Sequence, residues 1–370
     1  MKSVKAVAVH TYLGGMQLGV AETCDVETSL ESWEDAIEAR LRASERLAAS
    51  KMDFVPPWDD LKTWSGKADL VFANPPCARF SVTSARHYSA VKKTDLGEFC
   101  ELQDVCGIAQ SSGASMMWWE TGPMLWTKGR DMVESIHRYM ERWWGSCTTL
   151  LVKVDARTFG IPQKRSRVHA IHCEGRFVPT VNQLADMWPI KLTAHEWVVD
   201  QMTRRWKPQS KWLLPTNPSM LDTKPRDDWG DPIKYCQVQD LTCTFGQGKP
   251  QQFSVKDPFL PVVLSGRLGC WSELKRWISI EEWSAFMTIP PTYARAVADE
   301  IGSLKTLQLL SKGVCSDVSK GVSESFALPM LSRSGDTSLT ADDMWNEDCY
   351  EVDVSVFDRR KRRFRQGHQV

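Results

Sequence analysis

Cys77 stands at a position where the sequence could present a reactive thiol. It follows Pro75 and Pro76, which end the apolar run of residues 70–73. A short continuous apolar run is typical of a strand buried on both faces of a parallel sheet, and two prolines make the turn after it rigid. Because reacting groups gather at the carboxyl ends of strands in open α/β sheets, Cys77 is a candidate nucleophile. On this stretch alone, a buried structural cysteine is an equally good interpretation.

Charged residues flank two more apolar runs. Glu120 follows residues 115–119, and Arg165 and Arg167 precede residues 168–172. Alternate residues of a strand share a face, so the two arginines can act together. Taken singly, Glu120 could be an ordinary strand-end carboxylate and the arginines a solvated basic pair.

Short apolar runs alternate with amphipathic segments over residues 2–173. This pattern predicts an α/β fold with a Rossmann-like, mostly parallel sheet, whose elements would position these residues. The strand candidates are residues 4–9, 70–73, 115–119, 148–154 and 168–172. Helices are expected at residues 31–50 and 128–144, near 279–301, and at 317–326.

Composition divides the chain further. Residues 1–173 form the alternating domain, which the helices of residues 276–328 complete. Between them, scattered prolines, glycines and tryptophans in residues 174–275 predict a smaller irregular or β-rich domain. Residues 329–370 are expected to be a poorly ordered tail, with the basic run of residues 359–365 near its end.

Bulk properties exclude several classes of protein. The formal net charge is zero, and the apolar runs are too short to cross a bilayer. The 11 cysteines include no C-x-x-C pair, which favours reduced thiols over disulfides or a metal site. We therefore expect a cytoplasmic protein, in a bacterial cell or a virus-infected host, without membrane contact or metal and monomeric.

Four motifs in a fixed order connect these features. They are "TYLGGMQLG" (residues 11–19), "DLVFANPPCARFS" (69–81), "MWWETGP" (117–123) and "FGIPQKRSRVHAI" (159–171). Together they resemble the DNA cytosine-C5 methyltransferases, which carry a glycine-rich loop, a Pro-Pro-Cys loop, a Glu-Asn-Val strand end and a Gln-x-Arg-x-Arg segment. Residues 277–293 and 311–322 resemble later segments of that family.

The resemblance implies a catalytic set. The thiolate of Cys77 would add to carbon 6 of cytosine, so that carbon 5 can accept a methyl group. Glu120 would hold N3 and the amino group of the ring, and Arg167 would stabilise charge at O2, with Arg165 supporting the loop.

The resemblance also implies S-adenosylmethionine as the cofactor. Gly14 and Gly15 would let the backbone approach it, Glu31 would bind the ribose hydroxyls, Trp33 or Ser32 would lie at the adenine, and Asp60 would bind the adenine amino group. The positions assigned to the cofactor pocket are His10, Tyr12, Leu13, Gly14, Gly15, Glu31, Ser32, Trp33, Asp60, Leu61, Asn74, Pro76 and Val314.

Double-stranded DNA is the expected partner. The target cytosine would be flipped out of the duplex, and residues 174–275 would recognise the sequence around it, as in a restriction-modification enzyme. The basic run would add non-specific phosphate contacts.

Several positions depart from the family pattern, and they keep further functions open. Val314 replaces an Asn, while His10 and Lys312 could add positive charge, a combination that suits a modified S-adenosylmethionine with an extra carboxylate. An amino-methyltransferase of DNA is also possible, because "ANPPC" approaches an Asn-Pro-Pro-aromatic loop. A catalytically silent DNA-binding relative and an RNA cytosine methyltransferase complete the set.

Overall fold

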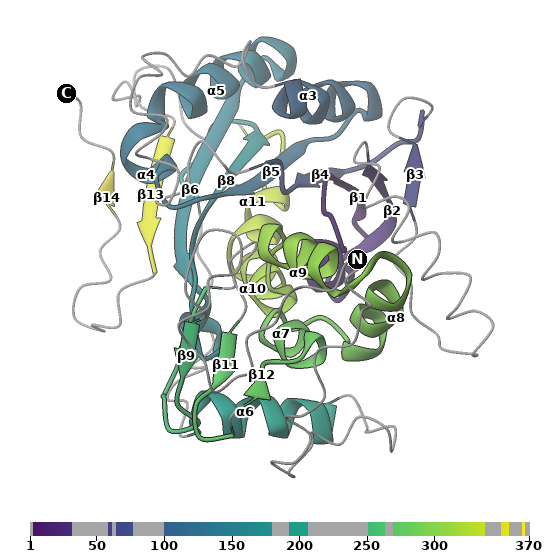
Figure 1. Ribbon diagram of the computed structural model, residues 1–370. Helices are drawn as coiled ribbons and strands as arrows, with labels where there is room; N and C mark the ends of the chain where they lie inside the picture. The colour runs from purple at the N-terminus through teal and green to yellow at the C-terminus, as the bar shows by residue number, and fades with distance from the viewer. Residues whose placement is uncertain are drawn as a thin grey trace.

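The computed structural model describes residues 3–31, 58–60, 64–76, 100–179, 192–205, 251–262, 269–274, 276–336, 349–354 and 365–366. Their main element is a nine-stranded sheet in the order β14-β13-β6-β8-β5-β4-β1-β2-β3 (Figure 1). The strands are β1 Lys5–Val9, β2 Asp25–Glu31, β3 Trp58–Asp60, β4 Leu70–Ala73, β5 Met116–Thr121, β6 Cys147–Asp155, β8 Ser166–Glu174, β13 Cys349–Asp353 and β14 Arg365–Gln366.

The sheet is mostly parallel. Strands β3, β2, β1, β4 and β5 are parallel neighbours, and β13 is parallel to β6. β8 runs antiparallel to both β5 and β6, and β14 runs antiparallel to β13. The carboxyl ends of β1, β2, β4 and β5 therefore meet at one edge, beside the start of β8.

Helices cover both faces of the sheet (Figure 1). Alternate strand residues enter two separate cores: Phe72 and Trp118 belong to one, and Val71 and Trp119 to the other. The second core includes α3 Cys100–Ser112, α4 Leu125–Lys128 and α5 Arg130–Trp144. The first includes α1 Gly15–Ala21, the 3-10 helix η3 Ala156–Phe159, α7 Ile280–Phe286, α8 Pro291–Ile301, α9 Ser303–Lys312, α10 Ser316–Val322, the π-helix η7 Ser323–Ala327 and α11 Leu328–Leu331.

A smaller region lies beyond β8 in the sequence. Its elements are α6 Ala194–Asp200, the π-helix η4 Gln201–Arg205, and the sheet formed by β9 Gln251–Phe253, β11 Gly269–Trp271 and β12 Arg276–Trp277. β10 Leu260–Pro261 pairs with β7 Gln163–Lys164, so this region is joined to the segment that precedes β8.

The predicted α/β fold is confirmed, and all five predicted strands are present. The sequence pattern missed β2 and β3, because Asp25 and Glu27 break the apolar signal of β2. Glu31, expected to start a helix, instead ends β2, and residues 32–50 lie outside the described residues. The helices expected near 279–301 are α7 and α8.

The start of α7 follows from its sequence. Ser279 and Glu282 form a capping box, in which Ser279 Oγ accepts from the Glu282 amide at 3.2 Å and Glu282 Oε2 accepts from the Ser279 amide at 2.8 Å. Such a reciprocal pair satisfies two of the backbone donors that a helix start leaves unpaired. The predicted beginning of helical structure at residue 279 is therefore correct.

The expectation of a poorly ordered tail from residue 329 is wrong for two segments. α11 and the turn after it continue to residue 336, and β13 adds to the sheet beside β6. Tyr350 and Val352 are buried, while Glu351 and Asp353 alternate with them. This alternation is the strand signal, and the acidic residues of the tail obscured it.

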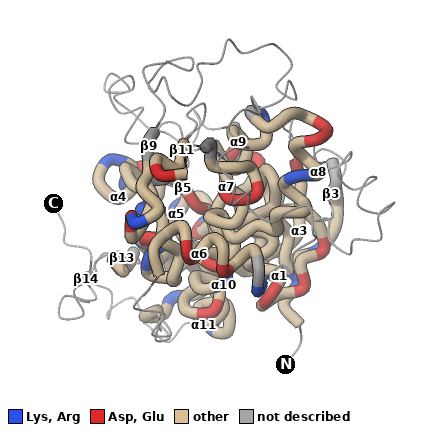
Figure 2. The backbone as a smooth tube through the Cα atoms, turned by 60° about the horizontal axis from the view of Figure 1, so that its bottom comes forward, with Lys and Arg blue, Asp and Glu red and all other residues tan. Residues whose placement is uncertain are grey.

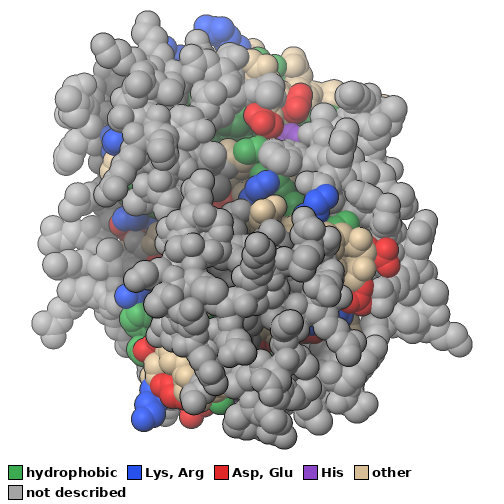
Figure 3. All heavy atoms as spheres, in the orientation of Figure 1, with side chains coloured by type: hydrophobic (Ala, Val, Ile, Leu, Met, Phe, Trp, Pro, Cys, Tyr) green, Lys and Arg blue, Asp and Glu red, His purple; other side chains and the backbone are tan. Residues whose placement is uncertain are grey.

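Charges of both signs are interspersed over the described part of the chain (Figures 2 and 3). Ion pairs such as Lys153–Asp353 at 2.9 Å and Arg176–Glu141 at 2.8 Å contribute to this pattern. Within the described ranges, no helix is long and apolar enough to cross a membrane, and no group of three His, Cys, Asp or Glu side chains could hold a metal ion.

Candidate active site

A buried carboxylate lies at the carboxyl end of β5. Glu120 is fully buried, and its Oε2 accepts a hydrogen bond of 2.5 Å from Asn74 Nδ2, at the end of the neighbouring strand β4. Arg167 Nε, at the start of β8, lies 2.8 Å from Glu120 Oε1. The sheet therefore brings together three polar side chains that are far apart in the sequence.

The ion pair leaves hydrogen-bonding capacity unused. Although Arg167 Nε and Glu120 Oε1 are close, neither makes an aligned hydrogen bond to any described residue, and neither does the buried Oδ1 of Asn74. Buried polar atoms are nearly always paired in proteins. The buried polar atoms without aligned hydrogen bonds mark this edge of the sheet as the candidate site.

Burial raises the pKa of the Glu120 carboxyl, and the charges of Arg167 and Arg165 oppose that rise. Burial disfavours the charged form of a carboxyl, whereas nearby cations favour it. Glu120 can therefore accept or release a proton closer to neutral pH than an exposed glutamate can, as an acid acting on a ring nitrogen requires.

The two arginines have different partners. Arg165 is buried, and its Nη2 donates to the carbonyls of Ser311, at 3.1 Å, and Gly313. It thus ties the segment before β8 to the end of α9, while Arg167 pairs with Glu120. Arg165 thus contacts the end of α9, while Arg167 lies at the carboxylate; the catalytic roles given to the two arginines stay predictions.

Cys77 lies outside the described residues, as do Ser32, Trp33 and Leu61. The description of the Pro-Pro-Cys loop ends at Pro76, two residues after Asn74, which binds Glu120. Cys77 therefore follows directly on the segment that reaches the buried carboxylate.

The loop after β1 has an unusual backbone. His10 and Tyr12 have φ of 55°, and Gly14 has φ of 81°. Positive φ is uncommon for residues with a side chain, and strain of this kind gathers at functional sites. Tyr12 and Leu13 are buried, and Lys312 Nζ lies 5.7 Å from the centroid of the Tyr12 ring.

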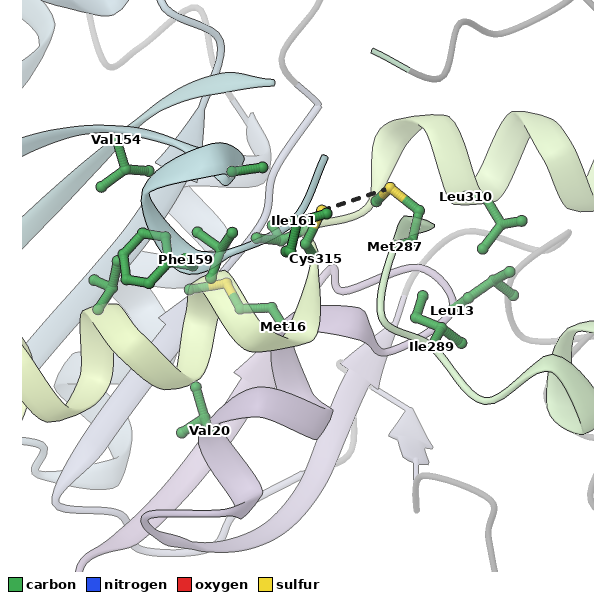
Figure 4. Packing of buried hydrophobic residues seen from close by; sticks show 14 of the residues in the cluster. Leu13, Met16, Val20, Val154, Phe159, Ile161, Met287, Ile289, Leu310 and Cys315 are labelled. Atoms are coloured by element: carbon green, nitrogen blue, oxygen red, sulfur yellow. Dashed lines mark hydrogen bonds between the residues drawn. The ribbon is translucent and has the colours of Figure 1, made fainter. Parts of the chain in front are cut away.

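The backbone of α1, which follows this loop, packs against the segment between α9 and α10, and that contact explains Gly15. A Cβ at Gly15 would lie 2.1 Å from the carbonyl oxygen of Val314, and one at Gly19 would lie 1.9 Å from that of Ser316. Gly15 therefore makes room for the loop between α9 and α10, and its approach to a cofactor stays a prediction. Figure 4 shows the hydrophobic side chains around this contact, with Cys315 Sγ 3.8 Å from Met287 Sδ.

Glu31 is buried at the carboxyl end of β2, where Oε1 accepts from the Thr11 amide at 2.8 Å and from Ser29 Oγ at 3.1 Å. Asp60 is its direct neighbour across the β2–β3 pair. Two acidic residues thus lie side by side at the ends of adjacent strands. That arrangement fits the expected contacts with ribose hydroxyls and an adenine amino group.

His10 is fully buried, and burial lowers its pKa to about 4. It is therefore neutral at pH 7, and the expectation that His10 adds positive charge to the pocket is wrong. Of the two groups invoked for an extra carboxylate on the donor, only Lys312 remains.

Sequence reasoning missed His169. It lies directly opposite Glu120 across the β5–β8 pair and is fully buried. Its Nδ1 accepts from Trp118 Nε1 at 3.1 Å, while its Nε2 makes no hydrogen bond to the described residues. It lies within the motif of residues 159–171, but the motif gives it no role, because only the strand register places it beside Glu120.

Solved structures provide the comparison. No family model and no curated sequence matches the chain, but the fold matches that of methyltransferases, at a level of identity that shows the fold alone. Entamoeba histolytica methyltransferase EhMeth has a TM-score of 0.52 and 10% identity, over 88% of this chain and 98% of that one. S. pombe Dnmt2 methyltransferase has 0.50 and 11%, over 87% and 97%, and a Spodoptera frugiperda DNMT2 mutant has 0.51 and 12%, over 89% and 100%.

Proposed function

We propose that this chain is an S-adenosylmethionine-dependent methyltransferase that transfers a methyl group to carbon 5 of a flipped-out cytosine in duplex DNA. The observation that carries the proposal is the buried Glu120, held between Asn74 and Arg167 at the strand edge. The order of motifs around Cys77, Glu120 and Arg167 supports it, as does the likeness in fold to methyltransferases.

The proposed chemistry begins at carbon 6 of the ring. The Cys77 thiolate forms a bond to carbon 6, and the electron pair of the 5,6 double bond becomes available at carbon 5. Glu120 binds N3 through its proton, and Arg167 offsets negative charge at O2. Once carbon 5 has accepted the methyl group, it loses its proton to a base, and the thiolate leaves as the double bond re-forms.

Several residues fit the cofactor. Glu31 and Asp60 would bind the adenosine part, and the loop of residues 10–15 would lie along it beside Val314. Asn74 presents a buried oxygen that no described residue engages. When bound, S-adenosylmethionine would supply an electrophilic methyl group on sulfur.

The covalent step has a direct test. Duplex DNA carrying 5-fluorocytosine is incubated with the protein and cofactor, because fluorine at carbon 5 prevents release of the thiol. We expect a denaturant-resistant adduct with the natural sequence and none with Cys77→Ala. Cys106→Ala is the matched control, since Cys106 is a free buried thiol in α3, outside the proposed site and the proposed recognition segment, and its adduct should form normally. No adduct with the natural sequence would contradict the covalent mechanism.

The product separates the remaining candidates. Mass spectrometry of nucleosides from treated DNA should find 5-methylcytosine. A heavier 5-substituted cytosine would indicate a modified donor, which Lys312 near Tyr12 still favours as the second candidate. N4-methylcytosine or N6-methyladenine would indicate an amino-methyltransferase, and unmodified DNA a silent relative. Modified RNA alongside unmodified DNA would move the substrate to RNA.

Residues 174–275 are proposed to recognise the target sequence. They interrupt the βα pattern and mix aromatic with basic residues, and base contacts of that kind are worth about 1–3 kcal/mol each. Exchange of this segment with that of a methyltransferase of different specificity should move the modified site. A site that stays with the amino-terminal part would refute the assignment.

A further inference from the structure

His169 differs from His172, the other buried histidine of β8, because its second ring nitrogen makes no hydrogen bond to the described residues. Trp118 Nε1 donates to its Nδ1 at 3.1 Å. In a neutral imidazole only one nitrogen carries the proton, so the proton is on Nε2. That N–H is fully buried and has no acceptor among the described residues. A buried donor without an acceptor costs free energy, so its presence calls for a partner.

The strand register identifies the partner. Glu120 and His169 are directly opposite each other in the antiparallel pair, and side chains so placed share a face, with Cβ atoms about 4.5–5.5 Å apart. Trp118 lies one step back along β5 on that face, so the nitrogen of His169 that Trp118 does not bind points away from Trp118. Glu120 Oε1 is a buried acceptor on the residue directly opposite His169, and it makes no aligned hydrogen bond to the described residues.

We propose that His169 is a positioning residue for Glu120: fixed by Trp118 as the Nε2–H tautomer, it donates to Oε1 of the carboxylate, while Asn74 holds Oε2. A turn of the carboxyl group brings Oε1 to this donor. Arg167 is then available to a ligand without leaving Glu120 unpaired. The inference deepens the proposed function, in which Arg167 is the group that turns to the base.

His172 is the natural control for this idea. It is also fully buried in β8, burial also lowers its pKa to about 3, and it also accepts from a tryptophan of β5, Trp119, at 3.1 Å. It faces the other core, however, and its second nitrogen is hydrogen-bonded to Thr149 Oγ1 at 2.8 Å. The two histidines therefore differ in whether the second nitrogen faces Glu120.

The test measures the Glu120 carboxyl directly, without any need for turnover. Carboxyl carbon NMR of protein labelled at glutamate follows its titration, and the signal is assigned by its loss in Glu120→Gln. A donated hydrogen bond favours the charged carboxylate, so His169→Leu should move the titration midpoint up by about one pH unit. His169→Gln keeps a donor and should restore the midpoint, and His172→Leu should leave it unchanged.

The other charged and titratable groups around Glu120 stay constant in these variants. They are Arg167 on β8, Arg165 before it, and Cys315 at the start of α10. The charges of both arginines and of Glu120 act on the Cys315 thiol. A midpoint that His169→Leu leaves in place, or that His172→Leu moves equally, would overturn the proposal.

A second measurement needs no variant that could fail to fold. Nitrogen-15 spectra of the natural sequence should show His169 neutral at pH 7 with its proton on Nε2, and the Nδ1–H tautomer would overturn the proposal. Methyl transfer is assayed separately. If Glu120 titrates as expected and no methylated cytosine forms, the proposed function fails while the pairing stands. If 5-methylcytosine forms and the midpoint does not move, the pairing of His169 with Glu120 fails while the proposed function stands.

Discussion

Each face of the β5–β8 pair carries a buried tryptophan that is hydrogen-bonded to a buried histidine, but the two faces differ in whether the other polar atoms are hydrogen-bonded. On the face toward α3 and α5, Trp119 donates to His172, and Thr149 connects His172 to His137 at 2.8 and 2.9 Å, a closed chain of hydrogen bonds. On the face with Glu120, one polar atom each of Glu120 (Oε1), Arg167 (Nε) and His169 (Nε2) makes no aligned hydrogen bond to the described residues. The comparison shows that the candidate site differs from the other face in its buried polar atoms without aligned hydrogen bonds, and not in the presence of buried polar residues.

The largest expected effect comes from replacing Glu120, the acid on the face whose polar atoms lack aligned hydrogen bonds. Glu120→Gln keeps the size of the side chain but cannot hold a transferable proton, so turnover should fall about 10²–10⁴-fold. Steady-state methylation assays measure the loss, and a thermal melt checks that the fold is kept. Thr149→Val, on the closed face, should lower stability while the remaining folded protein keeps its turnover rate. Equal turnover in the natural protein and Glu120→Gln would break the comparison.

Acid should destabilise both faces. Burial lowers the pKa of His169 and His172 to about 3, against 6.5 in an unfolded chain. The unfolded chain therefore takes up protons that the folded chain does not, and stability falls as the pH drops from 6.5 toward 3. At pH 5 the loss is roughly 2 kcal/mol for each histidine.

Urea unfolding at pH 7 and pH 5 measures this loss. His172→Leu should remove one proton from the difference and flatten the pH dependence. If the variant shows the same dependence as the natural sequence, His172 is already charged in the folded protein, and its place in a neutral hydrogen-bonded chain is wrong.

At neutral pH the closed chain should contribute to stability alone. His172→Leu leaves the Trp119 N–H without an acceptor and breaks the link to Thr149, at a cost of about 1–3 kcal/mol in the free energy of unfolding. Urea denaturation at pH 7 gives the value, and the 5-fluorocytosine adduct of the folded fraction should be unchanged. Loss of the adduct at full stability would show that the closed face also takes part in catalysis.

The tail should produce the smallest effect and separates packing from charge. Truncation after residue 358 removes the basic run and the two-residue strand β14 but keeps β13, so it should weaken DNA binding and flatten its salt dependence without changing the modified site. Truncation after residue 348 also removes Tyr350 and Val352, which are buried beside β6, and should lower the melting temperature. An unchanged salt slope after the shorter truncation would make the basic run a solvated surface.

Much of the sheet could be predicted because apolar runs identify strands wherever both faces are buried. β1, β4, β5, β6 and β8 were identified in this way. β2 was missed because two of its first three residues are charged and not buried, and β13 was missed because its acidic residues alternate with buried ones. The pairing of β13 with β6, 200 residues away, leaves no local trace.

The candidate site was predictable in its membership more than in its connections. The sequence indicated Glu120 and Arg167 through their motifs, and the structure brings them within 2.8 Å. Three other features depend on contacts between distant segments. They are the hydrogen bond of Arg165 to Ser311, the neutral state of His10 and the close packing of Gly15 against Val314. Residue type alone carries no information about such contacts.

By itself, the sequence determined which side chains are candidates for catalysis: a thiol after a rigid proline turn, a carboxylate at a strand end and arginines before a strand. Those assignments depend on local pattern and side-chain type, which the chain carries in any environment. Only the tertiary structure decided that Glu120 is buried with a raised pKa, that Asn74 binds it and that His169 lies opposite it. Burial, pKa and unpaired hydrogen bonds belong to the surroundings of a group, and the packing of the sheet creates those surroundings.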